Sequence, residues 1–344
     1  MPLASPILLG IESSCDDTAA AVVAGGALQS SIVSSQAVHG RFGGVVPELA
    51  SRAHQRLVVP VVEAALGEAG VAKHDLDAVA VTYGPGLAGS LLVGLSFAKA
   101  LALGLGIPLV GVNHLEGHLY SVFIEEPYPP LPYLCLTVSG GHTQLVLVQD
   151  GFRHEVLGTT RDDAAGEAFD KVAKMLSLGY PGGPVIDKLA REGDAAFQDF
   201  PRTRLGGPDG PFDFSFSGIK TAVLYYLNRF SDAEREALLA DYLPDIAASF
   251  QTAVVDVLVG ALRDAARAAG VEAVAVVGGV SANSQLRREA QVMAEAEGLR
   301  LFIPKPAYSV DNAAMIAVAG HRKWAAGIES TLDLAAAPAL AVSG

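Results

Sequence analysis

A strand–turn–strand pattern that occurs twice constrains the fold of this chain more than any other feature. Each copy has an apolar run, a short polar turn and a second apolar run, namely residues 7–13, 14–18 and 19–23, and residues 133–138, 139–143 and 144–148. Short apolar runs bounded by small polar residues are typical of strands joined by tight turns. A further turn and strand follow each copy. The repetition predicts an α/β protein with two duplicated halves facing each other across a central cleft, each presenting one turn to a phosphate group.

The length and composition agree with two globular domains. The chain has 344 residues, of which 51% are hydrophobic and 18% charged, so it can bury a large core. Its longest apolar runs are interrupted by Gly, Lys or polar residues, so we expect no membrane span. The N-terminus lacks the basic region and cleavage site of a signal peptide. Two cysteines, Cys15 and Cys135, give no disulfide framework, and we expect a cytoplasmic protein.

The boundaries between the parts are marked by proline and by composition. Residues 125–132 are acidic and rich in proline, which is typical of a linker. We therefore predict an N-terminal domain over residues 1–129 and a C-terminal domain over residues 130–309, followed by a helix at about 310–330 and a loose tail over 331–344. Within residues 43–66 an amphipathic helix is expected, which Pro60 should kink or divide.

His114 and His118 form the most specific chemical signal, four residues apart after a short buried strand. In a helix this spacing places both imidazoles on one face, where they can share one metal ion. The alternative is a pair of ordinary histidines at the surface or the start of a helix, and the spacing alone leaves both open.

The turns carry the other candidate groups. Asp16 and Asp17 lie in the first turn and are either ordinary turn residues or part of a phosphate-handling site. Gly140 and Gly141 in the second turn would let backbone amides approach an anion. Near Asn283, a glycine pair leads from a buried strand into a helix, where open α/β sheets place their ligands.

The net charge of −13 argues against broad, non-specific binding of nucleic acids, which requires a basic surface. A local basic strip such as Arg202, Arg204 and Lys220 remains a candidate contact, although such clusters are more often solvated faces.

Motifs along almost the whole chain, roughly residues 7–330, resemble one family in order. They are GIESSCDDT, GGVVPELASRAH, NHLEGHLYS, VSGGHTQLVLV, DDAAGEAFDKVAKML, YPGGP, FSFSGIKT, GGVSANSQLR and AYSVDNAAMIA. The chain resembles the bacterial branch of the tRNA N6-adenosine threonylcarbamoyltransferase family, once described as O-sialoglycoprotein endopeptidases. The resemblance implies the duplicated fold of actin, Hsp70 and sugar kinases, called the ASKHA fold, with the helix at about 310–330 completing the N-terminal domain.

The resemblance also implies an activity and a set of site residues. The family transfers threonylcarbamoyl from threonylcarbamoyl-AMP to the N6 amine of the adenosine 3′ of the anticodon, in tRNAs reading codons that begin with A. It implies a catalytic aspartate at Asp16, with Asp17 standing where many members have Glu. The implied metal ligands are His114, His118 and Asp311, and the implied substrate contacts are Thr137, Val138, Ser139, Gly140, Gly141, Asp170, Gly183, Asp187 and Asn283. Position 187 varies among members.

The implied cofactors and partners follow the same family. One metal ion per subunit is expected, Fe²⁺ in preference to Zn²⁺, with ATP, ADP or the acyl-adenylate in the cleft. The partners are tRNA, a smaller paralogous subunit (TsaB-like) that pairs with the N-terminal half, and a P-loop ATPase (TsaE-like). The apolar helix at residues 91–105 is a candidate pairing face, with plain core as the alternative reading.

Three alternative functions share features of this sequence. A zinc peptidase needs Glu directly after the first His, whereas Leu115 holds that position and Glu116 should point away from the metal face. A small-molecule kinase of the same fold would use ATP at the same turns, but kinases rely on Mg²⁺ and oxygen ligands, and a two-histidine site favours a softer metal. An ATP-binding scaffold without chemistry would show no transfer even with every partner supplied.

Overall fold

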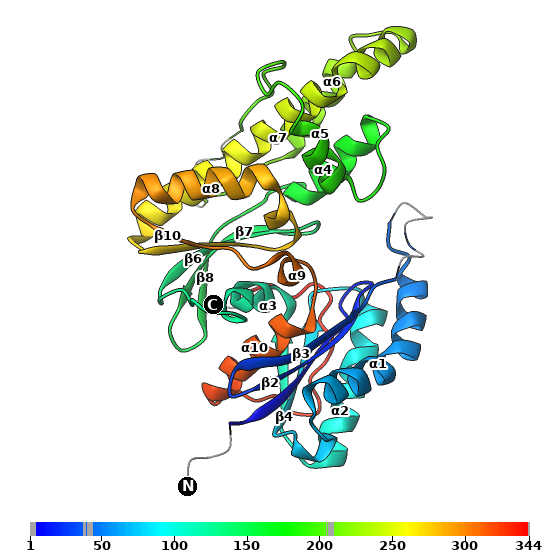
Figure 1. Cartoon of the computed structure of the whole chain (residues 1–344), viewed down its shortest axis with the longest axis vertical. Helices are drawn as coiled ribbons and strands as arrows, with labels where there is room; N and C mark the ends of the chain where they lie inside the picture. Colours follow the sequence, from blue (N-terminus) through cyan, green and yellow to red (C-terminus); the bar gives the residue numbers. More distant parts are fainter. Residues whose placement is uncertain (1–4, 37–38, 40–43, 204, 206–209, 343–344) are drawn as a thin grey trace. The chain divides into compact units, whose positions relative to one another are not determined.

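The protein is described here by a computed structural model covering residues 5–36, 39, 44–203, 205 and 210–342 (Figure 1). The chain forms two compact units. Unit 1 comprises residues 1–128, 150–153 and 304–344, and unit 2 comprises residues 129–149 and 154–303. The C-terminal stretch of the chain therefore folds with the N-terminal stretch.

Unit 1 is built on a five-stranded sheet with the order β3-β2-β1-β4-β5. Its strands are β1 (Ile7–Glu12), β2 (Thr18–Ala24), β3 (Ala27–Ser34), β4 (Ala78–Gly84) and β5 (Leu109–Asn113). Its helices are α1 (Pro47–Ala69), α2 (Ala88–Leu105), α3 (His114–Tyr120), α9 (Pro306–Ser309) and α10 (Ala313–Ala325), with short 3₁₀ turns η2 (Lys73–Asp75) and η3 (Ser121–Phe123).

Helices cover both faces of this sheet. α1 and α2 pack on one face and α10 packs on the other (Figure 1). The central strand β1 is buried almost throughout, as expected for a strand that is covered on both sides. A Cβ atom on Gly10 would lie 2.6 Å from the Ala317 backbone nitrogen, so only glycine allows α10 to approach β1 this closely.

Unit 2 is built on a second five-stranded sheet, with the strand order β10-β9-β6-β7-β8. Its strands are β6 (Tyr133–Val138), β7 (Thr143–Gln149), β8 (Arg153–Thr159), β9 (Ala273–Val277) and β10 (Arg300–Phe302). Its helices are α4 (Ala165–Met175), α5 (Gly182–Ala190), α6 (Ser217–Leu227), α7 (Asp232–Ala269) and α8 (Ser284–Glu297), with the 3₁₀ turn η4 (Gly279–Ala282).

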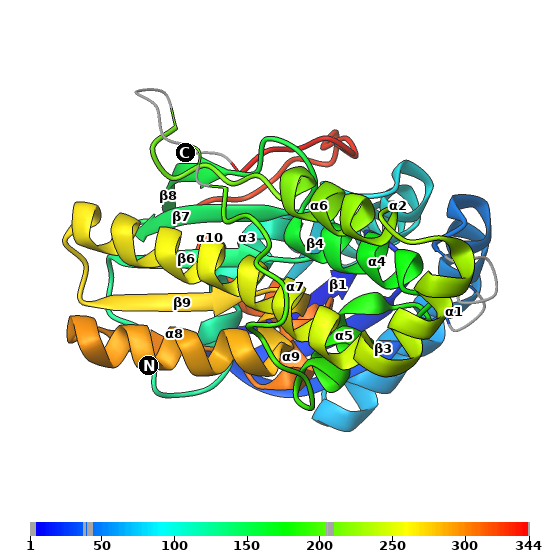
Figure 2. The same ribbon diagram turned by 90° about the horizontal axis from the view of Figure 1, so that it is seen from above.

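The two sheets share one topology, which confirms the predicted duplication. In each, the first strand pairs antiparallel with the second and parallel with a strand later in the chain, β4 in unit 1 and β9 in unit 2. Figure 2 shows α7 and α8 side by side along the direction of β9. The side chains of Phe169 in α4 and Phe250 in α7 meet edge to face in the core of unit 2.

Helix α1 and the C-terminal segment differ in detail from what the sequence predicts. α1 continues through Pro60 without dividing; the proline is exposed, and Val61 and Val62 beside it are buried in the core of unit 1. The segment expected to be a loose tail has no helix or longer strand in its described part. It is nevertheless held to unit 1, because Ala337 and Pro338 exchange backbone hydrogen bonds with residues after β4 and with Tyr83.

Two helices, α2 and α7, are long and apolar enough to cross a membrane by length and composition alone. This is weak evidence, because core helices of globular proteins meet the same criterion. The apolar 18-residue window of α7 is 72% buried inside the protein. α2 buries one side against unit 1 and exposes Leu92 and Leu103, whose exposed fractions are 53% and 68%.

Candidate metal centre and substrate site

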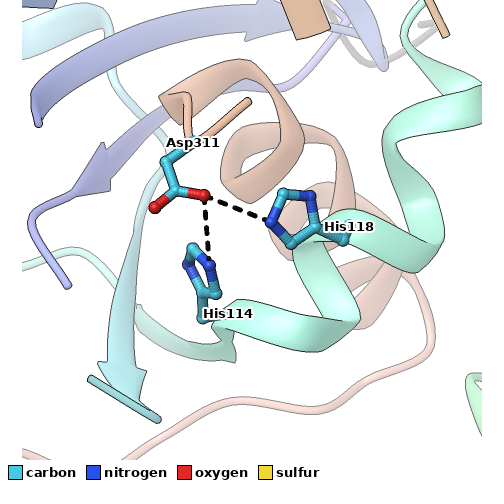
Figure 3. Close-up of side chains that lie close together, drawn as sticks. All are labelled: His114, His118 and Asp311. Atoms are coloured by element: carbon cyan, nitrogen blue, oxygen red, sulfur yellow. Dashed lines mark hydrogen bonds and ion pairs between the residues drawn. The ribbon is translucent and has the colours of Figure 1, made fainter. Parts of the chain in front are cut away.

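Three side chains from two distant parts of the sequence meet within unit 1 (Figure 3). β5 ends at Asn113, whose side chain caps α3 by accepting a hydrogen bond from the Leu115 amide. The helix therefore begins at His114 and places His118 one turn later on the same face. Asp311 lies between α9 and α10, and its Oδ1 atom is 3.3 Å from His114 Nε2 and 3.2 Å from His118 Nε2.

The two carboxylate–imidazole distances in this cluster fit a metal ion. The three ligand atoms lie within 4.8 Å of one another. A tetrahedral ion with bonds of about 2.0–2.1 Å separates its ligand atoms by roughly 3.3 Å, close to the observed carboxylate–imidazole distances. Two imidazoles and one carboxylate suit Fe²⁺ or Zn²⁺ and leave positions for other ligands. The structure thus assembles the residues that the metal prediction requires, while metal binding itself stays a prediction.

Strong electrostatic coupling surrounds this cluster. Burial opposes a charge on His114, but the carboxylates of Asp311 and Glu12 outweigh it and raise the pKa of His114 well above its usual range. Burial likewise opposes the charge on Asp311, yet the two imidazoles hold the pKa of Asp311 well below normal. A divalent cation would take over the role of the positive charge here.

Glu12 is a site residue that the sequence reasoning missed. It is the last residue of β1, its side chain is buried, and its Oε2 atom accepts a hydrogen bond from His114 Nδ1 at 3.0 Å. Thr82 in β4 donates to the same oxygen at 2.6 Å. The sequence did contain one signal for this role, a glutamate at the end of an otherwise apolar strand. A charged side chain is rarely buried unless it has a partner, so such a glutamate indicates a buried interaction.

The turn that carries Asp16 is held by buried side chains. His54 in α1 donates from Nε2 to the Cys15 carbonyl at 3.0 Å, and its Nδ1 accepts from the Thr18 hydroxyl at 2.8 Å. Ser90 at the start of α2 donates to the same Cys15 carbonyl. Two residues before Asp16, the Ser14 hydroxyl lies 3.2 Å from His114 Nδ1. The turn and the metal cluster are therefore directly linked.

Glu116 takes no part in the cluster. Its Oε2 atom accepts from the Asn113 amide at 3.3 Å and lies 3.7 Å from the Lys323 ammonium group. The side chain therefore points away from the metal face, as the helical spacing predicts. A peptidase mechanism would need this carboxylate as a base beside the metal, so the geometry does not favour that reading.

The other predicted residues belong to unit 2, beginning with the turn after β6. Thr137 and Val138 end the strand, and the Ser139 amide donates to the His142 carbonyl to close the turn. A Cβ atom on Gly140 or Gly141 would meet no protein atom within 4 Å. Space for a ligand is thus present at this turn, but neither glycine is required there by crowding within the protein.

The turn after β9 packs closely against the end of β6, and a glycine makes this close contact possible. Gly278 has a φ angle of +88°, and a Cβ atom there would lie 2.5 Å from the Val138 carbonyl oxygen. Only glycine permits this conformation and this approach. The predicted contacts at Val138 and Asn283 are therefore brought towards each other at the carboxyl ends of two neighbouring strands.

A buried glutamine, Gln251 in α7, joins two of the predicted contacts. Its Nε2 atom donates to Asp187 at 3.3 Å, and its Oε1 atom accepts from Asn283 Nδ2 at 2.7 Å. The Ser284 amide and hydroxyl also donate to Asp187. Asp170 separately accepts from the Gly182 amide at 2.7 Å, at the start of α5 beside Gly183.

Comparison with known proteins decides the family. The family model for tRNA N6-adenosine threonylcarbamoyltransferase (TsaD) matches residues 27–318. The chain belongs to the tRNA N6-adenosine threonylcarbamoyltransferase family. A member from Salinibacter ruber is 62% identical over 331 residues, covering 95% of this chain and 98% of the relative. A member from Symbiobacterium thermophilum is 54% identical over 343 residues, covering 98% and 97%.

Solved structures of lower identity share the fold of this threonylcarbamoyltransferase family member. Full-length HypF in its phosphate- and nucleotide-bound form aligns with a TM-score of 0.61 at 13% identity, covering 93% of this chain and 55% of that one. The activator of 2-hydroxyisocaproyl-CoA dehydratase from Clostridium difficile with bound ADPNP aligns with a TM-score of 0.51 at 16% identity, covering 93% and 96%. Together with the duplicated sheets, they confirm the predicted ASKHA-like fold.

Proposed function

We propose that this chain transfers the threonylcarbamoyl group of threonylcarbamoyl-AMP to the N6 amine of the adenosine 3′ of the anticodon, in tRNAs that read codons beginning with A. The observation that carries the proposal is the family match across nearly the whole chain, with relatives named for this transferase activity. The kinase, scaffold and peptidase alternatives gain no comparable support.

His114, His118 and Asp311 hold one metal ion in this proposal, Fe²⁺ in preference to Zn²⁺. Two imidazoles with one carboxylate and open positions are typical of non-haem iron sites, and zinc accepts the same ligands. When bound, the ion neutralises negative charge on the donor and orients it. The geometry that supports this role is the convergence of both Nε2 atoms on one oxygen of Asp311.

The donor is held by unit 2 in this proposal. The turn at Ser139, Gly140 and Gly141 offers backbone amides to the phosphate or the carbamoyl oxygen, where charge develops during transfer. Asp187 and Asn283 contact the adenosine and ribose, supported by the Gln251 network, and the α5 start at Gly183 contributes amides. ATP, ADP or the acyl-adenylate would occupy the same place.

Asp16 accepts the proton from the attacking adenosine amine or positions the donor. Its turn is fixed at Cys15 by His54 and Ser90 and is linked through Ser14 to His114. A catalytic group must lie at a set distance from the reacting atoms, and a turn held by these contacts can keep Asp16 at that distance.

The partner proteins supply the basic surface for tRNA binding that this acidic chain lacks. Arg202 is paired with Asp199 and Asp256, and Lys220 is paired with Asp163, so the proposed basic strip is largely neutralised within the protein. Arg204 lies outside the described residues. The exposed apolar side of α2 suits the paralogous TsaB-like subunit, and a TsaE-like ATPase completes the assembly.

Transfer of radiolabelled threonylcarbamate from threonylcarbamoyl-AMP to tRNA tests the function directly. We expect incorporation with the metal-loaded protein and its partners, and none when His114→Ala replaces the wild-type chain. A tRNA transcript with a different base in place of the target adenosine should remain unlabelled. Absence of label with all components present and folded would overturn the proposal, and phosphorylation of a small molecule would favour the kinase alternative.

A further inference from the structure

Glu12 occupies a position that connects three parts of unit 1. Its side chain is 1% exposed, and its two oxygens accept hydrogen bonds from the Ser14 amide, the Thr82 hydroxyl and His114 Nδ1. These donors belong to the Asp16 turn, to β4 and to α3, respectively. A buried carboxylate with three donors is well satisfied, so it can hold each donor in place.

The contact with His114 determines which ring nitrogen faces the metal position. A carboxylate is only an acceptor, so the Nδ1 atom that faces Glu12 must carry hydrogen. When a metal ion takes the place of the Nε2 hydrogen that faces Asp311 at 3.3 Å, the lone pair lies on Nε2. In known metal sites a carboxylate that receives the second N–H of a ligating imidazole fixes its tautomer and orientation, and strengthens it as a ligand.

The two histidines of the cluster differ in the hydrogen-bond partners of their Nδ1 atoms. Among the described residues, His118 Nδ1 is buried and has no hydrogen-bond partner. His118 thus has one carboxylate partner, Asp311, whereas His114 has a carboxylate on each side. The asymmetry singles out His114 as the ligand whose tautomer is set in advance by the protein.

We infer that Glu12 is a positioning residue for the metal centre, which fixes His114 as an Nε2 ligand and ties that ligand to the turn carrying Asp16. The inference rests on the metal site of the proposed function. Glu12 itself is not a metal ligand, and it acts through His114. Its loss should weaken metal binding even where the fold is kept.

Zinc affinity of the full-length, metal-free protein, measured by competition with a chromogenic chelator, tests this inference. We expect Glu12→Gln to lower the affinity about 10- to 100-fold, because glutamine has one acceptor oxygen for three donors. Glu116→Gln is the matched control, since Glu116 is also buried, at 2% exposed, but bonds Asn113 and Lys323 instead of a metal ligand. Its affinity should stay within about threefold of wild type.

Two further variants show whether a negative result rules out only the role of Glu12 or the metal site itself. If His114→Ala and Asp311→Ala bind zinc as tightly as wild type, the proposed site itself is wrong. If both lose zinc while Glu12→Gln binds it like wild type, the site stands and the role of Glu12 is overturned. If Glu12 only stabilises the fold, Glu12→Gln should have a lower unfolding temperature in its metal-free form, and its folded fraction should bind zinc with unchanged affinity.

A measurement on the wild-type protein keeps the inference testable if the variant does not fold. The ¹⁵N chemical shifts of the imidazoles in the zinc-loaded protein report which nitrogen carries hydrogen. We expect His114 to show a protonated Nδ1 and a metal-bound Nε2. A metal-bound Nδ1 on His114 would contradict the arrangement with Glu12.

Discussion

His118 Nε2 lies 3.2 Å from Asp311 Oδ1, although 193 residues separate the two in the sequence. Both belong to unit 1, because the chain returns there after completing unit 2. The first part of the chain supplies the two imidazoles and the last part supplies the carboxylate. Metal binding should therefore depend on the docking of the segment around α10 onto the N-terminal sheet.

Asp311→Asn should release the metal while leaving the overall fold in place. The change removes the one negative charge that faces both imidazoles, and an amide oxygen is a poorer ligand than a carboxylate. We expect metal affinity to fall by at least about tenfold and transfer to tRNA to fall with it. Elemental analysis after dialysis measures the loss. Full metal content in the variant would contradict the assignment of Asp311.

Asp16→Ala should abolish transfer without releasing the metal. The Cys15 carbonyl of this turn is held by His54 and Ser90, and these two contacts stay in place when the Asp16 side chain is removed. If Asp16 accepts the proton, a loss of about 10²- to 10⁴-fold is expected. Single-turnover transfer with preformed acyl-adenylate measures it, and metal content and circular dichroism serve as controls. Wild-type transfer in this variant would remove Asp16 from the mechanism.

His54→Leu should loosen the same turn from its other side. The buried imidazole makes hydrogen bonds to the Cys15 carbonyl and the Thr18 hydroxyl, and leucine can make neither. We expect a loss of about 1–3 kcal/mol in the free energy of unfolding, together with reduced transfer at unchanged metal content. Urea denaturation measures the first effect. His74→Leu, at an exposed position in η2, is the control and should behave like wild type.

Asp17 should make the folded protein less stable as pH rises, whereas a typical paired aspartate makes it more stable. Burial, opposed by a hydrogen bond from Ser35, raises the pKa of Asp17 to about 6. An unfolded aspartate titrates near 3.9, so between about pH 4 and 6 the folded state binds the proton more tightly than the unfolded state. This contribution to stability is present at low pH and is lost as pH rises through about 6.

Asp17→Asn tests this pH dependence. The amide carries no charge at any pH, so the variant should gain stability relative to wild type as pH rises from 5 to 7.5. Urea denaturation of both proteins at each pH gives the difference. A difference in stability that does not change with pH would show that the Asp17 carboxyl titrates normally in the folded protein.

Gln251→Leu should impair binding of the donor in unit 2. The substitution leaves Asp187 and Asn283 without their shared partner, and both lie among the predicted substrate contacts. We expect a loss of about 1–3 kcal/mol in unfolding free energy and an increase of roughly tenfold in the KM for threonylcarbamoyl-AMP. Gln291→Leu, at an exposed position of α8, should change neither quantity. A fall in kcat with unchanged KM would argue against a role in donor binding.

The duplicated fold was predictable because its signal is local and repeated. Each antiparallel strand pair is connected by a short turn, so apolar runs and turn residues that lie together in the sequence also lie together in space. The spacing of His114 and His118 was local in the same sense. Asp311 was reached only through the resemblance, since no pattern within the chain connects a residue to another 193 positions away.

The supporting residues of the site were not predictable by the same reasoning. Glu12 and His54 act on residues from other elements, and Gln251 lies within a long helix whose pattern marks only which side is buried. Hydrogen-bond partners across elements follow from packing that no periodicity encodes. Of the two effects expected of Pro60, a kink or a division of the helix, the division is wrong, since α1 runs from Pro47 to Ala69 as one helix.

The hydrogen bond from the Asn113 side chain to the Ala341 carbonyl, 228 residues away, has a practical consequence for handling this protein. Asn113 caps the helix that begins with His114, and Val342, next to Ala341, is only 8% exposed. A purification tag joined to this end of the chain would begin within a few residues of Ala341 in the sequence, and Ala341 makes a contact that supports a proposed metal ligand. Metal content measured on such a fusion should be compared with that of the untagged chain before it is taken as a property of the protein.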